Sequence, residues 1–341
     1  MNQTHFSIAT FNLYNLNLPG LAIYTDRDGW SQTEYDAKIA WTAEMLRRLD
    51  ADVIGLQELW HRDAIEAALI AAGLDSTYEV LATPAVGTRI ICAALVRKDL
   101  LVAGSAEWIQ AFPPKLILRS TQEDHQTPDI EVAIRGFARP VLHFRIALRD
   151  SSPDTEVFVC HLKSKAPAPV YREDWFKADS DFYRRHSTAL GSAMSTIRRT
   201  AEATGLRMML TEVMKGTVTP VIVLGDLNDG QHSNTLNITT EQPRYLVGES
   251  TGGSDVALYT AQTLQEYRDT RDVYYTHVHE DMRESLDHVL VSEQFYDHSR
   301  RRIWLFDGLS ITNDHLDDED HKATGTSDHG VVKVGFRYRP A

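Results

Sequence analysis

The sequence lacks the features of disulfide-stabilised, membrane-spanning and exported proteins. Its 341 residues include only two cysteines, Cys92 and Cys160, and both lie in apolar stretches that favour small buried side chains over a disulfide or a metal pair. No segment approaches the roughly 18 consecutive apolar residues of a membrane span. The first residues, MNQTHFSIATFNLYNL, have no basic stretch followed by an apolar one, as a signal peptide would. We therefore expect a soluble, cytoplasmic protein with no membrane partner.

Positive charge is also scarce. Lysine and arginine total 35 against 48 aspartates and glutamates, which gives a formal net charge of −13. Such a surface repels polyanions as a whole, and this argues against a protein that coats nucleic acid. It argues less against an enzyme, because a bound divalent cation and a local basic wall reverse the sign of the field inside a cleft.

Internal repeats and Gly/Ser-rich linkers are absent too, so we predict one domain over residues 1–341. Short apolar runs typical of strands dominate, with a few helical patterns between them. Because strands and helices do not alternate strictly, the pattern predicts an α/β fold of two packed mixed sheets flanked by helices. Two stretches, near 110–131 and 166–186, are predicted to be insertions, and loops of that length usually border a functional site.

What the sequence does contain is a series of polar residues at the ends of apolar strands. Functional residues gather in such places because strand ends are held rigidly and yet exposed. The six motifs are TFNLYN with Asn12, IGLQEL with Glu58, FVCHLKSK with His161 and Lys163, VLGDLND with Asp226 and Asn228, SLDHVLVS with Asp287, and TSDHGVV with Asp328 and His329. Carboxylate and amide oxygens suit Mg²⁺, Mn²⁺ or Ca²⁺, and histidines with carboxylate partners suit proton transfer or phosphate stabilisation.

Two local patterns refine this prediction. Asp226 and Asn228 stand two positions apart at a strand end and are expected to share one side, whereas Asp229 should turn away and cap the turn at Gly230. The tight histidine pair in His277–His279 alternates on a predicted strand and is expected to be exposed, not a ligand pair, since zinc usually takes more His or Cys at close spacing.

The ordered set of motifs resembles the endonuclease/exonuclease/phosphatase superfamily, and its bacterial nuclease-like members in particular. The resemblance runs from about residue 5 to residue 338, in the family's order of an N-terminal Asn, QE, a strand-end His, GDxN, LD and SDH. It implies a four-layer α/β sandwich with the site at the edge where both sheets end. It also implies a Mg²⁺-dependent hydrolase of phosphate esters, with Mn²⁺ or Ca²⁺ as alternative cations.

The same resemblance implies roles for the residues that meet the metal and the water. Glu58 would be the principal metal ligand, assisted by Asn12 and Asp328, a sparse oxygen shell of the kind that Mg²⁺ prefers. Asp226 would orient or deprotonate the attacking water, and Asn228 would donate a hydrogen bond to the phosphate.

The histidines are assigned by resemblance as well. His329 would donate to a phosphoryl oxygen or transfer a proton, with Asp287 fixing its tautomer and favouring its charged form. His161 would be the second imidazole on the phosphate. Alternation along HLKSK would then place Lys163 and Lys165 on the same side as His161.

A local excess of positive charge follows these motifs. Residues 163–199 hold eight basic side chains against four acidic ones, which makes a plausible wall for a phosphate-rich substrate. We predict that Lys163 and Arg199 bind the substrate. The aromatic residues interleaved there could stack on bases, but we expect them to pack the insertion onto the body. They are Tyr171, Trp175, Phe176, Phe182 and Tyr183.

Several subfamilies fit this chain less well than a nuclease. Inositol 5-phosphatases carry a Trp-Cys-Asp-Arg run where this chain reads ESLDH, and AP endonucleases carry a Tyr where it has His161. Sphingomyelinase-like relatives are exported and have an apolar hairpin. The first prediction is therefore a metal-dependent phosphodiesterase that acts on DNA or RNA. The alternatives are a phosphomonoesterase or a lipid or inositol phosphate phosphodiesterase on the same site, and, against the intact set of motifs, a non-catalytic binding module.

Overall fold

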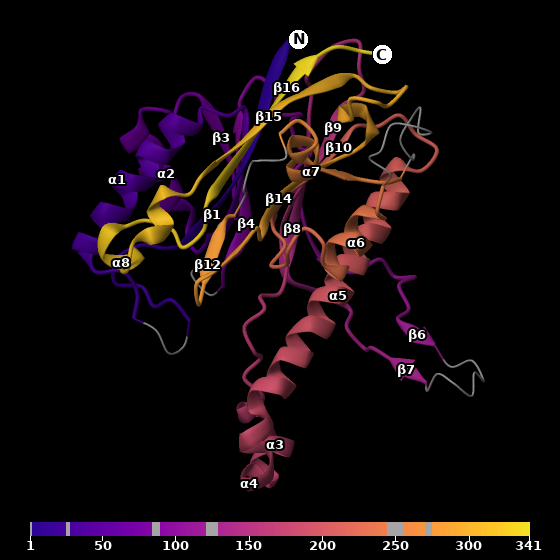
Figure 1. The fold of residues 1–341 in the computed structure, drawn as a ribbon. Helices are drawn as coiled ribbons and strands as arrows, with labels where there is room; N and C mark the ends of the chain where they lie inside the picture. The colour runs from indigo at the N-terminus through magenta and orange to yellow at the C-terminus, as the bar shows by residue number, and fades with distance from the viewer. Residues whose placement is uncertain (1, 25–27, 84–88, 121–128, 244–255, 270–274) are drawn as a thin grey trace.

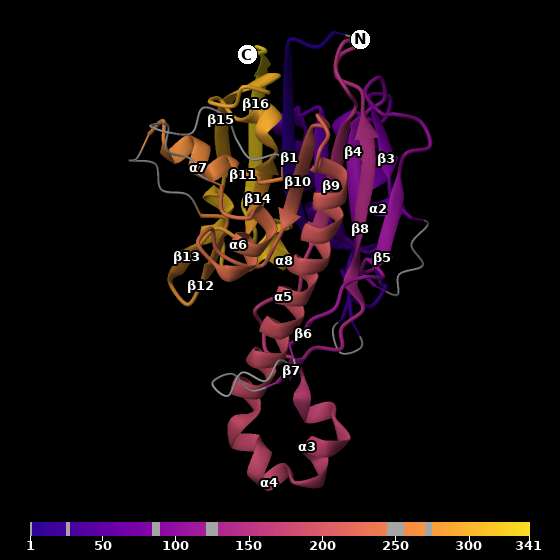
Figure 2. The ribbon, with the colours of Figure 1, turned by 90° about the vertical axis from the view of Figure 1, so that its right-hand side faces the viewer.

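The chain folds around two six-stranded mixed sheets that pack face to face (Figures 1 and 2). The computed structural model describes residues 2–24, 28–83, 89–120, 129–243, 256–269 and 275–341. Helices α1 (Gln32–Leu49) and α2 (Arg62–Ala72) cover the outer face of one sheet, and α5 (Ser187–Met214) and α6 (Asn234–Thr240) cover that of the other. The predicted four-layer α/β sandwich is confirmed, whereas the assignment of one domain to the whole chain stays a prediction.

Each sheet has a pair of parallel strands at its centre. The first sheet has the order β15 (Trp304–Thr312), β16 (Val331–Tyr338), β1 (His5–Leu16), β2 (Val53–Leu59), β4 (Ile91–Arg97) and β3 (Tyr78–Leu81). The second has the order β11 (Tyr259–Thr260), β14 (Asp287–Val291), β10 (Val221–Asp226), β9 (Thr155–His161), β8 (Gly136–Ile146) and β5 (Glu107–Ala111). β1 runs parallel to β2 and β9 parallel to β10, so the carboxyl ends of these four strands reach one edge of the sandwich.

Alternation along the central strands separates the apolar layers. On β1, Phe6 and Ile8 face the space between the sheets, whereas Ala9 and Phe11 face α1 and α2. A third apolar cluster lies between the second sheet and α5. Gly55 of β2 faces the inter-sheet space, where a Cβ atom would lie 2.1 Å from a methyl carbon of Leu224. The two sheets can approach this closely because position 55 has no side chain.

The flanking helices begin and end at ordinary sequence signals. Ser31 caps α1: its hydroxyl accepts from the N–H of Glu34, whose carboxylate accepts from the N–H of Ser31. α2 ends at Gly73, which takes the left-handed φ of 72° that closes many helices. In the described part of the chain, no helix is both long enough and apolar enough to cross a membrane.

The insertion at 166–186 is helical, and it projects from the body as an arm (Figures 1 and 2). It forms η1 (Val170–Arg172), α3 (Asp174–Ala178), α4 (Ser180–Tyr183) and η2 (Arg184–His186) at the far end of α5. Phe176 is buried, but Tyr171, Trp175 and Phe182 keep 56%, 46% and 48% of their surface exposed. The expectation that the aromatic residues pack the insertion onto the body is therefore wrong for these three.

Two small hairpins complete the fold. β6 (Arg119–Ser120) pairs with β7 (Ile130–Glu131) inside the predicted insertion at 110–131, whose central residues 121–128 lie outside the described part. β12 (His277–His279) pairs with β13 (Met282–Glu284) beside the edge where β1 and β2 end. The short helices α7 (Ala261–Glu266) and α8 (His321–Thr324) lie in the C-terminal third of the chain.

Candidate active site

The predicted strand-end residues meet at one edge of the sandwich. Asp226 ends β10 directly beside His161 at the end of β9, and Asp287 begins the antiparallel β14 opposite Asp226. A cleft of about 1380 Å³ opens over this edge. Seven of the predicted residues line it: Glu58, His161, Lys163, Asp226, Asn228, Asp328 and His329.

Unusual backbone conformations aim some of these side chains. Glu58 has φ of 61° at a point where the register of β2 on β4 shifts between Leu56 and Leu59. Such a bulge turns a side chain away from the ordinary alternation of a strand. Gly225 has φ of 139°, and a Cβ there would lie 1.9 Å from the carbonyl oxygen of Cys160. The position before Asp226 therefore needs glycine to bring β10 against β9.

Asp226 and Asn228 share the cleft, but not because of strand alternation. The strand ends at Asp226, and Asn228 lies in a turn with φ of 55° and donates its N–H to Asp226 Oδ1 at 2.8 Å. Its side-chain amide donates to the Leu162 carbonyl at 3.0 Å. Asp229 turns away from the cleft, as predicted, and accepts the N–H of Gly230 at 3.2 Å.

The carboxylate of Asp226 lies at the centre of the cleft floor. Its Oδ2 accepts from Asn12 Nδ2 at 3.2 Å, and it lies 3.4 Å from His161 Nε2 and 3.9 Å from His329 Nε2. Burial raises the pKa of Asp226 to about 7, with Asp287 adding to the rise and His329 opposing it. Near neutral pH this carboxyl group is therefore poised between its two protonation states.

His329 and Asp287 form a buried pair. His329 Nδ1 lies 2.8 Å from Asp287 Oδ2, so this nitrogen carries a hydrogen and Nε2 is left toward the cleft. Burial alone lowers the pKa of His329, but Asp287 and Asp226 together raise it well above its ordinary value. The geometry suits an imidazolium that donates to an anion.

His161 has the opposite character. It is fully buried, and burial lowers its pKa well below the ordinary value, with the positive charges of Arg139, His329 and Lys163 lowering it further. Its Nε2 lies between Asp226 Oδ2, at 3.4 Å, and Glu58 Oε1, at 3.9 Å. A neutral His161 is thus placed to donate one hydrogen to the carboxylates of the floor.

The carboxylates of Glu58 and Asp328 fit a divalent cation. Burial raises the pKa of Glu58, and the negative charge of Asp328 raises it further, so the two groups repel each other across a water-poor site. Glu58 Oε2 accepts only one backbone hydrogen bond that the structure shows, from Asn15 at 3.0 Å. A cation beside these oxygens would relieve both the repulsion and the shortage of donors.

Asn12 contacts Asp226 from beneath the cleft. It is completely buried and lies below the residues that line the cleft. Its Oδ1 accepts the N–H of Tyr14 at 3.0 Å, while its Nδ2 donates to Asp226. These contacts orient Asp226, and the role of Asn12 as a metal ligand stays a prediction.

The two predicted substrate-binding residues are separated by the structure. Lys163 lines the cleft, as does Lys165. Arg199 is only 5% exposed and lies outside the cleft lining. Its Nε pairs with Asp229 Oδ2 at 3.3 Å and its Nη1 donates to the Lys163 carbonyl at 3.2 Å. The expected contact between Arg199 and the substrate is therefore wrong. The guanidinium instead supports the two loops that carry Lys163 and Asp229, because it bonds to both of them.

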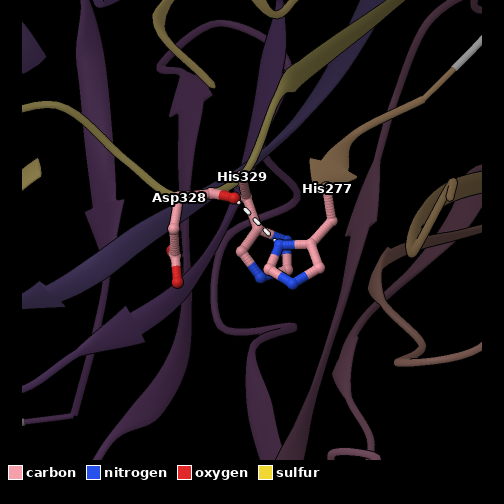
Figure 3. Close-up of side chains that lie close together, drawn as sticks. All are labelled: His277, Asp328 and His329. Carbon is pink, nitrogen blue, oxygen red and sulfur yellow. Dashed lines mark hydrogen bonds between the residues drawn. The ribbon is translucent and has the colours of Figure 1, made fainter. Parts of the chain in front are cut away.

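Arg139 and His277 are residues of the cleft that were not identified as site residues from the sequence. Arg139 of β8 lines the cleft and donates to the Leu162 carbonyl at 3.0 Å. His277, expected to be exposed, is half-buried: its Nδ1 lies 3.0 Å from the Asp328 carbonyl oxygen and its ring centre lies 4.9 Å from that of His329. Figure 3 shows the two imidazoles side by side.

His277 also belongs to a second group of side chains whose ligand atoms lie close enough together to hold a metal ion. Ligand atoms of His277, Asp328 and His329 lie within 4.8 Å of one another, as do those of Asp226, Asp287 and His329. His279 is exposed, as expected, and the statement that the two histidines are not a ligand pair stays a prediction. The tight histidine spacing was the only sequence feature that pointed to a role for His277 in the cleft. No sequence feature pointed to Arg139.

Comparison with known proteins identifies the architecture. Three solved structures share a TM-score of 0.55 with this chain and cover 98% of it: an endonuclease/exonuclease/phosphatase family protein of Bacteroides thetaiotaomicron (15% identity, 98% of that chain), truncated TDP2 of Caenorhabditis elegans (13%, 98%), and a mannosyl-6-phosphatase of Bacteroides thetaiotaomicron (14%, 100%). At these identities the likeness shows the fold alone. No curated protein sequence matches the chain. The family model described as "Endonuclease/Exonuclease/phosphatase family" matches residues 9–329, and the chain therefore belongs to that family.

Proposed function

We propose that this protein is a divalent-metal-dependent phosphodiesterase that hydrolyses nucleic acid, in the endonuclease or exonuclease mode. One observation supports this proposal above the others. A buried imidazole–carboxylate pair, a carboxyl group poised near neutrality and two repelling carboxylates converge in one cleft with basic side chains on its wall. Phosphoryl transfer needs positioning and charge stabilisation of this kind more than covalent chemistry.

Glu58 and Asp328 are the proposed metal ligands. When bound, Mg²⁺ or a similar cation would polarise a phosphoryl oxygen and neutralise charge on the leaving oxygen. Asn12, the third ligand implied by resemblance, acts in this proposal through Asp226, because its amide already donates to that carboxylate.

Asp226 is the proposed base for the attacking water. The amide of Asn12 and the imidazole of His161 hold its carboxylate from two sides. A pKa of about 7 suits a group that must take a proton near neutral pH. His161 thereby acts on the base, and a direct phosphate contact is not needed.

His329, oriented by Asp287, is the proposed donor to the phosphoryl oxygen. Asn228 lines the cleft next to Asp226, and the Leu162 carbonyl takes one of its two amide hydrogens. The other is proposed to reach the phosphate. Together these donors would bind the anion that forms as the water attacks.

The size and charge of the cleft favour a polymeric phosphodiester. Five basic residues line it, in a chain whose net charge is −13: Arg89, Arg139, Lys163, Lys165 and Arg172. Its volume of about 1380 Å³ exceeds the roughly 300–1000 Å³ of typical small-molecule pockets. A cytoplasmic location remains part of the proposal.

A substrate screen tests the proposal. The purified protein would be incubated with Mg²⁺ or Mn²⁺ and with single-stranded DNA, double-stranded DNA, RNA, bis-p-nitrophenyl phosphate or p-nitrophenyl phosphate, with EDTA controls. We expect metal-dependent hydrolysis of the nucleic acids and of the synthetic diester. Hydrolysis of the monoester alone would overturn the proposal in favour of a phosphomonoesterase, the activity named for the similar mannosyl-6-phosphatase.

A further inference from the structure

A lysine is buried behind the cleft without a carboxylate partner. Lys38 of α1 has no exposed surface, and its ammonium donates to the Thr326 carbonyl at 2.8 Å. Three aromatic rings surround the ammonium, with centres 5.6 Å (Tyr14), 5.7 Å (Trp30) and 5.2 Å (Trp41) away. Among the described residues no acidic group forms an ion pair with it. A buried charge held this way is costly unless its position serves a purpose.

The carbonyl that Lys38 contacts begins the segment Thr326–His329, which carries Asp328 and His329 into the cleft. Ser327 fixes this segment to β1, because its hydroxyl donates to the Asn12 carbonyl at 2.8 Å and accepts the N–H of His329 at 3.1 Å. Lys38 fixes the preceding residue, Thr326, to α1. Two adjacent anchors thus set the start of the segment, and the residues that follow them are Asp328 and His329.

A second observation shows that the segment fits closely against α1 at this point. Gly325 has φ of +77°, and a Cβ there would lie 2.5 Å from the main-chain nitrogen of Lys38 and 2.5 Å from the carbonyl carbon of Ala37. The backbone of the loop therefore touches the backbone of the helix next to the buried ammonium. Only glycine allows this approach.

The charge of Lys38 interacts electrostatically with the proposed metal ligands. Burial lowers the pKa of Lys38 to about 7, and the carboxylates of Asp328 and Glu58 act against that shift. In its protonated form, Lys38 therefore offsets part of the repulsion between these two carboxylates. Its field acts together with the geometric anchor at Thr326.

We infer that Lys38 is a positioning residue of the active site, which holds the Thr326–His329 segment, and with it Asp328, at the distance from Glu58 that cation binding requires. The inference rests on the proposed function for its catalytic readout, but its cation-binding readout does not depend on any substrate.

Lys333 provides a matched control. Its ammonium also donates to a backbone carbonyl at the α1 side of the first sheet, that of Leu49, at 2.5 Å, but Lys333 lies outside the cleft lining. Comparison of Lys38→Met with Lys333→Met separates a general loss of a lysine–carbonyl bond from a loss of site geometry. Lys38→Gln keeps an N–H donor and removes the charge.

The test measures Mn²⁺ binding by electron paramagnetic resonance of the free ion, and kcat and KM for bis-p-nitrophenyl phosphate. For Lys38→Met we expect Mn²⁺ binding to weaken about tenfold and kcat to fall about tenfold or more, with KM within about twofold of the wild-type value. Lys38→Gln should recover part of both losses, and Lys333→Met should match the wild type. Wild-type Mn²⁺ binding in Lys38→Met would overturn the inference.

Gly325→Ala keeps the test decisive if Lys38→Met does not fold. The added methyl group should push the loop from α1 and reproduce the loss of Mn²⁺ binding with Lys38 intact. Unchanged Mn²⁺ binding in a folded Gly325→Ala protein would equally overturn the inference. If the wild type hydrolyses no phosphodiester, the proposed function fails, and the binding measurements still decide the role of Lys38.

Discussion

The cleft floor and the arm are built in opposite ways. In the floor, polar side chains are buried and meet from distant parts of the sequence: the Ser327 hydroxyl reaches the carbonyl of Asn12, 315 positions away. In the arm, three aromatic side chains are exposed, and the rings contact near neighbours, such as Trp175 on Tyr183 with ring centres 5.0 Å apart. The floor therefore depends on the whole sandwich, whereas the arm depends chiefly on itself. Changes in the two regions should have separable effects.

The largest effect is expected in the floor. Asp226→Ala or His329→Ala should reduce metal-dependent diester hydrolysis by about 10³-fold or more, because each removes a group proposed to act on the water or the phosphate. Activity and circular dichroism of the purified variants check this. Wild-type activity in either folded variant would refute the proposed mechanism.

The substitution Asp287→Asn should have the next largest effect. The change is nearly isosteric, but it removes the charge that holds His329 cationic and leaves that imidazole with a neutral partner. We expect kcat to fall about 10²-fold with little change in KM. The high-pH limb of the rate profile, which follows deprotonation of His329, should move to lower pH. A profile identical to the wild-type one would show that Asp287 does not set the charge of His329.

The buried floor should also leave a signature in stability. Because the folded-state pKa of Asp226 is raised to about 7, the folded protein binds a proton there that the unfolded chain, with an ordinary Asp, has lost. Stability should thus fall as pH rises from about 4 to about 7 and then level off. Asp226→Asn removes this dependence, so in EDTA its gain in Tm over the wild type should be larger at pH 8 than at pH 5. Equal gains would contradict the raised pKa.

A smaller effect is expected at the cleft wall. Lys163→Ala should raise KM for an oligonucleotide several-fold, with a weaker effect on the small diester, because the lysine contributes mainly charge to the wall. Raising the salt concentration should reduce the difference in KM between the variant and the wild type. A salt-independent loss would indicate a structural role instead.

The smallest effect is expected in the arm. The double variant Trp175→Ala/Phe182→Ala removes two exposed rings and should leave kcat for bis-p-nitrophenyl phosphate within about twofold and Tm within a few degrees. Calorimetry and the diester assay measure both. A large loss of activity would show that the arm supports the floor, and the contrast between the two regions would fail.

The sequence predicted the floor better than the arm for a physical reason. Buried strands are recognised by their apolar runs, and the polar residues that end them must meet wherever strand directions bring their ends to one edge. This accounts for Glu58, His161 and Asp226. Their order along the chain carried the family resemblance, which the match over residues 9–329 confirms.

The residues that sequence reasoning misplaced depend on long-range packing. Asn12 and Arg199 have polar groups that could bind a metal or a substrate, but these groups bond to Asp226 and Asp229 instead. No local sequence pattern reveals which partner a buried amide or guanidinium will find. Arg139 stands inside an ordinary strand and reaches the cleft only because of where β8 lies beside β9. The arm was taken for a loop because its helices are too short to show a periodicity.

The close contact at Gly55 has a consequence for catalysis. Asn12 and Asp226, Glu58 and His161, and His329 and Asp287 each join a residue on the side of the first sheet to a residue of the second. The rate of the proposed reaction should therefore depend on how the two sheets are aligned. A methyl group added at Gly55, in the dry interior and remote from any substrate, would overlap the Leu224 side chain of the second sheet, and a shift of the sheets that relieved this overlap would disturb all three pairs together.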